Sequence, residues 1–143
     1  MFNNLKSRRN KKSGFTLIEL LVVILILGIL IAVAIPLYLT SVRNAGTRTV
    51  QANIKTIAQA SQAYRVKNGA YPAAADLVTE GDLTQPVDQM GPTGVAYTMA
   101  TAGGVLTITA TESTDRFGGT GSTDTLSYNL TTGVWTPSAG WSL

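Results

Sequence analysis

The sequence of 143 residues contains no cysteine and no histidine. Without cysteine there is no disulfide, no thiol nucleophile and no lipid-modified cysteine, and without histidine the common zinc sites and His-based acid–base catalysis are missing too. No nucleophile-elbow, phosphate-loop or dinucleotide-binding pattern occurs either. The sequence therefore predicts no enzymatic activity and no cofactor.

Charged residues are absent from Leu20 to Val42. The first twenty of these residues, at a rise of 1.5 Å each, span roughly the 30 Å core of a bilayer. A transmembrane helix is therefore expected here. Five basic residues precede it: Lys6, Arg8, Arg9, Lys11 and Lys12. By the positive-inside rule they keep the N-terminus in the cytoplasm.

The basic pI of about 9.4 comes from this leader. After Gly14 the chain carries six basic and eight acidic residues, a net charge of −2. Direct nucleic-acid binding is therefore not expected. Two ordinary interpretations of the apolar run stay open: a secretory signal cleaved near Ala32-Val33-Ala34, which has the A-x-A form, and an unprocessed signal anchor.

The segment KKSGFTLIELLVVILILGILIAVAIP resembles the class III signal of type IV prepilins and of the pseudopilins of type II secretion systems. The likeness rests on a basic leader, Gly14, Phe15, Thr16 and Glu19, followed by the uncharged run. It implies that a membrane aspartyl prepilin peptidase cuts after Gly14, removing residues 1–14. It also implies that the new amine of Phe15 is methylated, and that Thr16 and Glu19 act in assembly.

A carboxylate within a membrane-spanning helix costs about 2.5–3.5 kcal/mol on insertion scales and usually pairs inside an assembly. The nearest cation would be the amine that cleavage creates at Phe15. The resemblance implies that this pair forms between neighbouring subunits, so that Glu19 docks the incoming subunit. The alternative is that Glu19 reaches the lipid headgroups from its place near the helix start.

Gly28 and Pro36 lie within the apolar segment, residues 15–42. Pro36 cannot donate a hydrogen bond to the carbonyl of Ala32, so a kink or local unwinding is expected. One interpretation is a tolerated bend. The resemblance implies another, in which the segment extends when the subunit moves from the bilayer into a filament.

Residues 43–69 are predicted to continue the helix in amphipathic form, because one stripe recurs at spacings of 3 and 4. The stripe consists of Val50, Ile54, Ile57, Ser61 and Tyr64. Lys67, Asn68 and Gly69 form a helix-stop signal, and Pro72 prevents resumption. The stripe is expected to pack against a sheet rather than against a separate coiled-coil partner.

Residues 70–143 are predicted to form a small globular head. VAYTMA and VLTITAT flank a turn at Gly103-Gly104, and TLSYNL and GVWTP flank a second turn, which predicts three or four antiparallel strands. The fold class is therefore α+β, the type IV pilin fold that the resemblance implies. Trp135 and Trp141 are expected to anchor the C-terminal loop by packing, with ligand binding as the weaker alternative.

The most polar stretch runs from Glu112 to Asp124. Its spacing matches no calcium-binding pattern, so a solvated loop is predicted and no metal site. Asp115 and Asp124 are the weak candidates for calcium ligands.

The sequence as a whole predicts a structural subunit that polymerises with copies of itself into a type IV pilus or similar filament. Its partners would be the membrane, the prepilin peptidase, an inner-membrane platform protein and an assembly ATPase. The subunit would start as a single-pass protein of the cytoplasmic membrane and end in a surface pilus. Two alternatives remain: a major pseudopilin in a periplasmic pseudopilus, and an unprocessed signal-anchored binding module.

Overall fold

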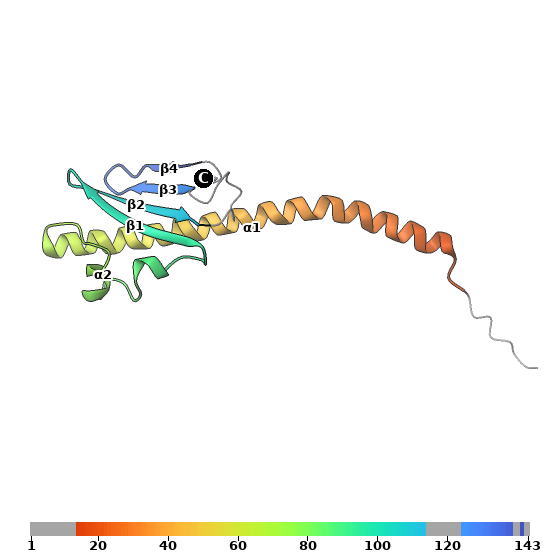
Figure 1. The fold of residues 1–143 in the computed structure, drawn as a ribbon, viewed down its shortest axis with the longest axis horizontal. Helices are drawn as coiled ribbons and strands as arrows, with labels where there is room; N and C mark the ends of the chain where they lie inside the picture. Colours follow the sequence, from red (N-terminus) through yellow and green to blue (C-terminus); the bar gives the residue numbers. More distant parts are fainter. Residues whose placement is uncertain (1–13, 114–123, 139–140, 142–143) are drawn as a thin grey trace, which may run out of the picture. The chain divides into compact units, whose positions relative to one another are not determined.

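A computed structural model describes residues 14–113, 124–138 and 141. Its dominant element is helix α1, Leu17–Asn68, which contains 52 residues (Figure 1). By internal contacts the chain divides into two compact units, one ending at Tyr38 and the other beginning at Leu39. The division therefore falls within α1.

The first unit exposes an apolar helix surface. From Leu17 to Tyr38 the large hydrophobic side chains are between 43% and 86% exposed. By length and composition, α1 is the one helix among the described residues that can cross a membrane. The helix runs through Pro36 without interruption, so the structure shows no local unwinding there. The loss of one backbone donor is a local defect that a long helix tolerates.

The second unit contains a four-stranded antiparallel sheet in the order β1-β2-β3-β4. The strands are β1 Val95–Ala102, β2 Val105–Glu112, β3 Thr125–Asn129 and β4 Trp135–Pro137. A short helix α2, Asp76–Thr79, and a 3₁₀ turn η1, Val87–Gln89, precede the sheet. The predicted α+β class and both hairpins are confirmed.

One stripe of α1 forms the helical side of the core. Val50, Ile54, Ile57 and Ser61 are completely buried, as the spacing predicted, and Tyr64 is partly buried. Alternation along β2 supplies the opposite side through Leu106, Ile108 and Ala110. Figure 1 shows the sheet lying along this part of α1.

Asn53 connects α1 to the segment after η1. Its side-chain amide donates to the Met90 carbonyl at 2.9 Å and to the Tyr97 hydroxyl at 3.1 Å. Burial raises the pKa of Tyr97, while the bond from Asn53 acts in the opposite direction. Gly91 lies so close to this ring that an added Cβ would come within 2.5 Å of Tyr97 Cε2. The Asn53 side chain, beside the apolar stripe, therefore fixes the position of this segment against α1. The helical periodicity of the sequence did not predict this contact.

Glycines with positive φ lie at the helix end and at the first hairpin turn that the sequence predicted. Gly69 ends α1 with φ +77° and donates its N–H to the Arg65 carbonyl at 2.8 Å. Gly103 and Gly104, with φ +58° and +77°, form the β1–β2 turn. Positive φ at both central residues is the geometry that a two-residue hairpin favours.

We predict that Ile54→Ala lowers the free energy of unfolding of the second unit by about 2–5 kcal/mol, because it leaves a cavity in a closed core. The matched control Gln59→Ala changes an exposed residue of the same helix and should stay within about 0.5 kcal/mol of wild type. Denaturant unfolding of the full chain in detergent, followed by tryptophan fluorescence, measures both. Equal losses in the two variants would contradict the assigned core.

We also predict that Gly104→Ala destabilises the hairpin by about 1–2 kcal/mol, since a Cβ is unfavourable at positive φ. Gly104→Asn should lose less, because asparagine tolerates this conformation. Thermal unfolding of the two variants side by side checks this order. An alanine variant as stable as the asparagine variant would mean that the turn adopts another geometry.

Candidate processing and assembly site

The start of α1 brings together the residues that the sequence assigned to processing and assembly. Thr16 precedes the first helical residue, Leu17, and Glu19 lies in the first turn. The Glu19 Oε2 atom accepts hydrogen bonds from the Thr16 backbone N–H at 2.9 Å and from the Thr16 hydroxyl at 2.7 Å. The Glu19 N–H donates to the Thr16 hydroxyl at 3.4 Å. This reciprocal arrangement is a capping box.

The capping box gives Glu19 a partner within its own chain. Its carboxylate also lies where the helix dipole favours negative charge. Sequence reasoning assigned Thr16 to assembly but did not find this bond, although Thr-x-x-Glu before an apolar run is the usual signal for it. Both bonds from Thr16 end on Oε2, so an amine approaching Glu19 can bind the other carboxylate oxygen or compete with Thr16 for Oε2.

Gly14 and Phe15 precede the helix and are exposed, Phe15 to 76%. The scissile bond that the resemblance implies thus lies in non-helical chain. The basic leader residues Lys6, Arg8, Arg9, Lys11 and Lys12 lie outside the described residues.

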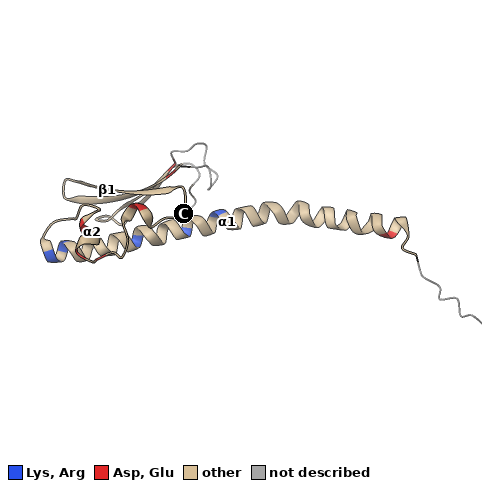
Figure 2. Cartoon of the chain, turned by 60° about the horizontal axis from the view of Figure 1, so that its bottom comes forward, with Lys and Arg blue, Asp and Glu red and all other residues tan. Residues whose placement is uncertain are grey.

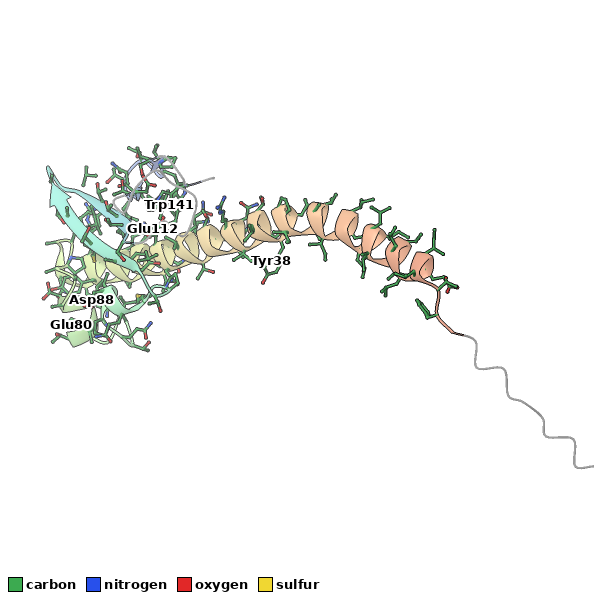
Figure 3. All side chains as sticks on the ribbon, turned by 45° about the vertical axis from the view of Figure 1, so that its right-hand side comes forward. Tyr38, Glu80, Asp88, Glu112 and Trp141 are labelled. Carbon is green, nitrogen blue, oxygen red and sulfur yellow. The ribbon has the colours of Figure 1, made fainter. Side chains whose placement is uncertain are left out.

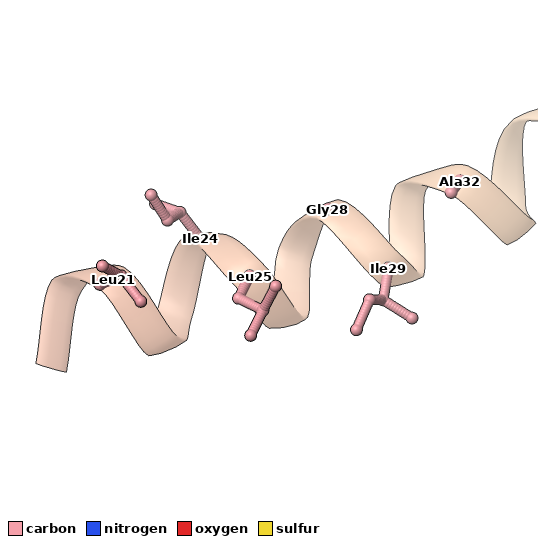
Figure 4. Close-up of a pocket in the computed structure, with 6 residues that line it drawn as sticks. All are labelled: Leu21, Ile24, Leu25, Gly28, Ile29 and Ala32. Carbon is pink, nitrogen blue, oxygen red and sulfur yellow. The ribbon is translucent and has the colours of Figure 1, made fainter. Parts of the chain in front are cut away.

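Two shallow hollows occur on this part of α1. One borders Glu19 and is otherwise lined by apolar side chains, those of Phe15, Ile18, Val22 and Val23. The other lies at Gly28, where the missing side chain leaves the backbone open (Figure 4). Its lining is Leu21, Ile24, Leu25, Gly28, Ile29 and Ala32. A Cβ added at Gly28 would meet no atom within 4 Å, so no neighbouring element of the chain requires glycine there.

The polar stretch from Glu112 to Asp124 differs from the prediction at both ends. Glu112 is only 1% exposed because it continues the inward-facing alternation of β2, and Asp124 is 8% exposed. Asp124 Oδ1 accepts a bond from the Ser138 hydroxyl at 3.4 Å. Glu112 and Asp124, the two ends of this stretch, therefore do not belong to a solvated loop.

Asp115, the other weak calcium candidate, lies outside the described residues. Within the described part of the chain no group of three His, Cys, Asp or Glu residues could hold a metal ion.

The two tryptophans behave as packing residues. Trp141 is 6% exposed and belongs to the hydrophobic core, on the same side of the head as Glu112 (Figure 3). Trp135 is partly buried, and its ring centroid lies 4.5 Å from that of Tyr128. The burial of Trp141 and the ring contact of Trp135 both agree with the predicted anchoring of the C-terminal segment.

Comparison with known proteins adds an independent observation. Residues 9–35 match the family model described as the prokaryotic N-terminal methylation motif. Type II secretion system core protein G of Pseudomonas aeruginosa is 42% identical over 66 residues, 46% of each chain. The type IV wide pilus major component PilA4 of Thermus thermophilus is 38% identical over 81 residues, 56% of this chain and 61% of that protein.

Competence protein ComGC of Halalkalibacterium halodurans is 29% identical over 74 residues, 52% of this chain and 72% of that protein. The chain spans about half the length of the secretion and pilus relatives that it matches. No solved structure matches the chain. The methylation motif, these relatives and the α+β architecture agree: over about half of its length the chain is similar to type IV pilins and to type II secretion pseudopilins.

Proposed function

We propose that the chain is the repeating structural subunit of a type IV pilus or pilus-like filament. The observation that carries the proposal is the capping box of Thr16 and Glu19 at the N-terminal start of an exposed apolar helix, within the matched methylation motif. The subunit is first a single-pass protein of the cytoplasmic membrane and then part of a filament on the cell surface. Its role is structural rather than catalytic.

Processing links the leader to assembly. The prepilin peptidase hydrolyses the bond between Gly14 and Phe15, removes the basic leader and leaves a free amine on Phe15. Methylation of this amine keeps it basic. Because the cut lies before the apolar run, the helix stays in the membrane while the charge at its start changes.

After cleavage, the hydrogen-bond donor to the Glu19 carboxylate changes from Thr16 to an amine. In the uncut chain its Oε2 accepts two bonds from Thr16, which lowers the cost of placing a carboxylate in lipid. A charged amine forms a stronger hydrogen bond with a carboxylate than a neutral donor does. We propose that the Phe15 amine of a neighbouring copy takes this oxygen, so that only a processed subunit docks.

The apolar helix surface supplies the driving force for packing. When the helix leaves lipid it needs another apolar environment, and the helices of neighbouring copies provide one. The open hollow at Gly28 allows a close approach of a second helix. Pro36 removes one backbone hydrogen bond from the helix. We propose that the segment from Gly28 to Pro36 extends in the filament. An assembly ATPase and an inner-membrane platform protein perform the extraction.

A second candidate function is that of a major pseudopilin in a periplasmic pseudopilus. The identity of 42% with a type II secretion core protein G favours it. Electron microscopy at native expression separates the two functions, since long surface fibres indicate a pilus and fibres seen only on overexpression indicate a pseudopilus.

Glu19→Ala tests the proposal. We expect normal cleavage and methylation by mass spectrometry, and at least a tenfold loss of filaments in the sheared surface fraction, because the amine has no carboxylate to bind. Normal filament yield from Glu19→Ala would contradict the pairing. An intact leader on the wild-type protein would contradict filament assembly and support a signal-anchored binding module.

Thr16→Val removes the hydroxyl bond at 2.7 Å but keeps the backbone bond at 2.9 Å. The loss of a cap costs about 1 kcal/mol, so filament yield should lie between those of wild type and Glu19→Ala. Thr16→Ser is the matched control and should behave like wild type. A serine variant as defective as the valine variant would show that the threonine methyl group matters instead of the hydroxyl.

A further inference from the structure

The second unit contains opposite charges that are exposed and unpaired within the described chain. Most of its described charges have partners or are buried. Lys67 Nζ lies 2.7 Å from Asp82 Oδ1, and this bond raises the pKa of Lys67. The Arg65 guanidinium donates to the Tyr71 hydroxyl at 2.8 Å and lies over the Tyr71 ring.

Four of the remaining charges form two groups. Arg48 and Lys55 are exposed on α1, and Glu80 and Asp88 are exposed at the C-terminal end of α2 and in η1. None of the four makes an ion pair within 4.0 Å in the part of the chain that the structure describes. Figure 2 shows the basic residues in blue along α1 and acidic residues in red on the segment with α2 and η1.

Arg48 and Lys55 are seven residues apart, about two helical turns, so they share one face of α1. Val50 and Ile54 on the same helix are completely buried, and the face of Arg48 and Lys55 points away from that stripe. We call this pair the basic stripe. It follows the apolar segment, at the level where the helix would leave the membrane.

Glu80 and Asp88 form what we call the acidic patch, and Figure 3 labels both on one side of the head. Glu80 is close enough to Lys67 to contribute to the raised pKa of that lysine. Asp88 is two residues from Met90, which accepts the bond from Asn53. The acidic patch thus extends along α1 from the level of Asn53 to that of Lys67.

The geometry points to an interface between copies of this chain, in which the basic stripe of one copy contacts the acidic patch of the next. This inference rests on the proposed filament and adds a second contact to it, outside the apolar helices. The basic stripe and the acidic patch are different surfaces, so the contact between two copies is heterologous. Each copy can therefore bind a further copy, and the copies can form an open-ended filament. Counted along α1, their centres differ by on the order of 10 Å, which is the axial offset that the contact requires.

A second copy fits these surfaces better than an unrelated anion or cation would. Each group has two charges of one sign, and the two groups are equal and opposite. Opposite charges that meet across an interface steer association and set its register, and like charges that meet oppose it. The same chain thus has both halves of a complementary contact.

Charge reversal tests the interface in the full chain. Lys55→Glu and Asp88→Lys, made singly, should each reduce the sheared filament fraction about tenfold, with cleavage and membrane level unchanged. Lys55→Glu and Asp88→Lys combined should restore the fraction to within about threefold of wild type. The control Arg43→Glu reverses an exposed charge about 140° around the same helix from Arg48 and should assemble normally.

Cysteine pairing gives a second measurement, because the natural chain has no cysteine. A chain with both Lys55→Cys and Asp88→Cys should form a disulfide-linked ladder of multimers on mild oxidation. The chain with Arg43→Cys and Asp88→Cys should not. Normal filaments from both single reversals, failure of the combined reversal to rescue, or absence of the ladder would each overturn the interface while leaving the filament intact. A wild-type chain that forms no filament would overturn both.

Discussion

The exposed apolar surface of the first half of α1 is the constraint on which the rest of the molecule depends. A helix with side chains such as Leu17 and Leu37 uncovered cannot remain in water, because the cost grows with the apolar area left exposed. Lipid can cover this surface, and so can other helices of the same kind. The molecule therefore has two suitable environments, and its proposed function is the passage from one to the other.

In the proposed function, Glu19 makes this passage selective. A purely apolar helix would pack against any other helix in the membrane, whereas a carboxylate near its start has to be satisfied. Thr16 satisfies it inside the chain, through two bonds to a single oxygen. In the proposed function, cleavage adds a cation next to this carboxylate, the new amine of Phe15, which the uncut chain does not have at that position. In the proposed function, cleavage and docking are thus coupled through the Glu19 carboxylate.

The head uses the second half of α1 in a different way. Here the helix buries the stripe around Ile54 and Ile57 beneath the sheet, so this surface is already covered. Its opposite face has Arg48 and Lys55 in solvent, while the segment with α2 and η1 exposes Glu80 and Asp88. One continuous helix thus provides an apolar surface in one unit and a charged one in the other. The proposed contacts through the two surfaces should therefore respond differently to salt, which screens exposed charges but does not weaken apolar packing.

The sequence by itself determined the apolar span and the N-terminal methylation motif, because both are read directly from the order of residues. It also determined the stripe from Val50 to Tyr64, the stop at Gly69 and the turn at Gly103-Gly104, because these depend on the local period or on backbone φ. The tertiary structure decided what depends on contacts between distant residues. Asn53 donates to Met90 and Tyr97, more than thirty residues away, and a side chain at Gly91 would meet the Tyr97 ring and the Val95 carbonyl. Glu112 was expected in a solvated loop but is buried, since its face is set by its register in β2 and not by its polarity.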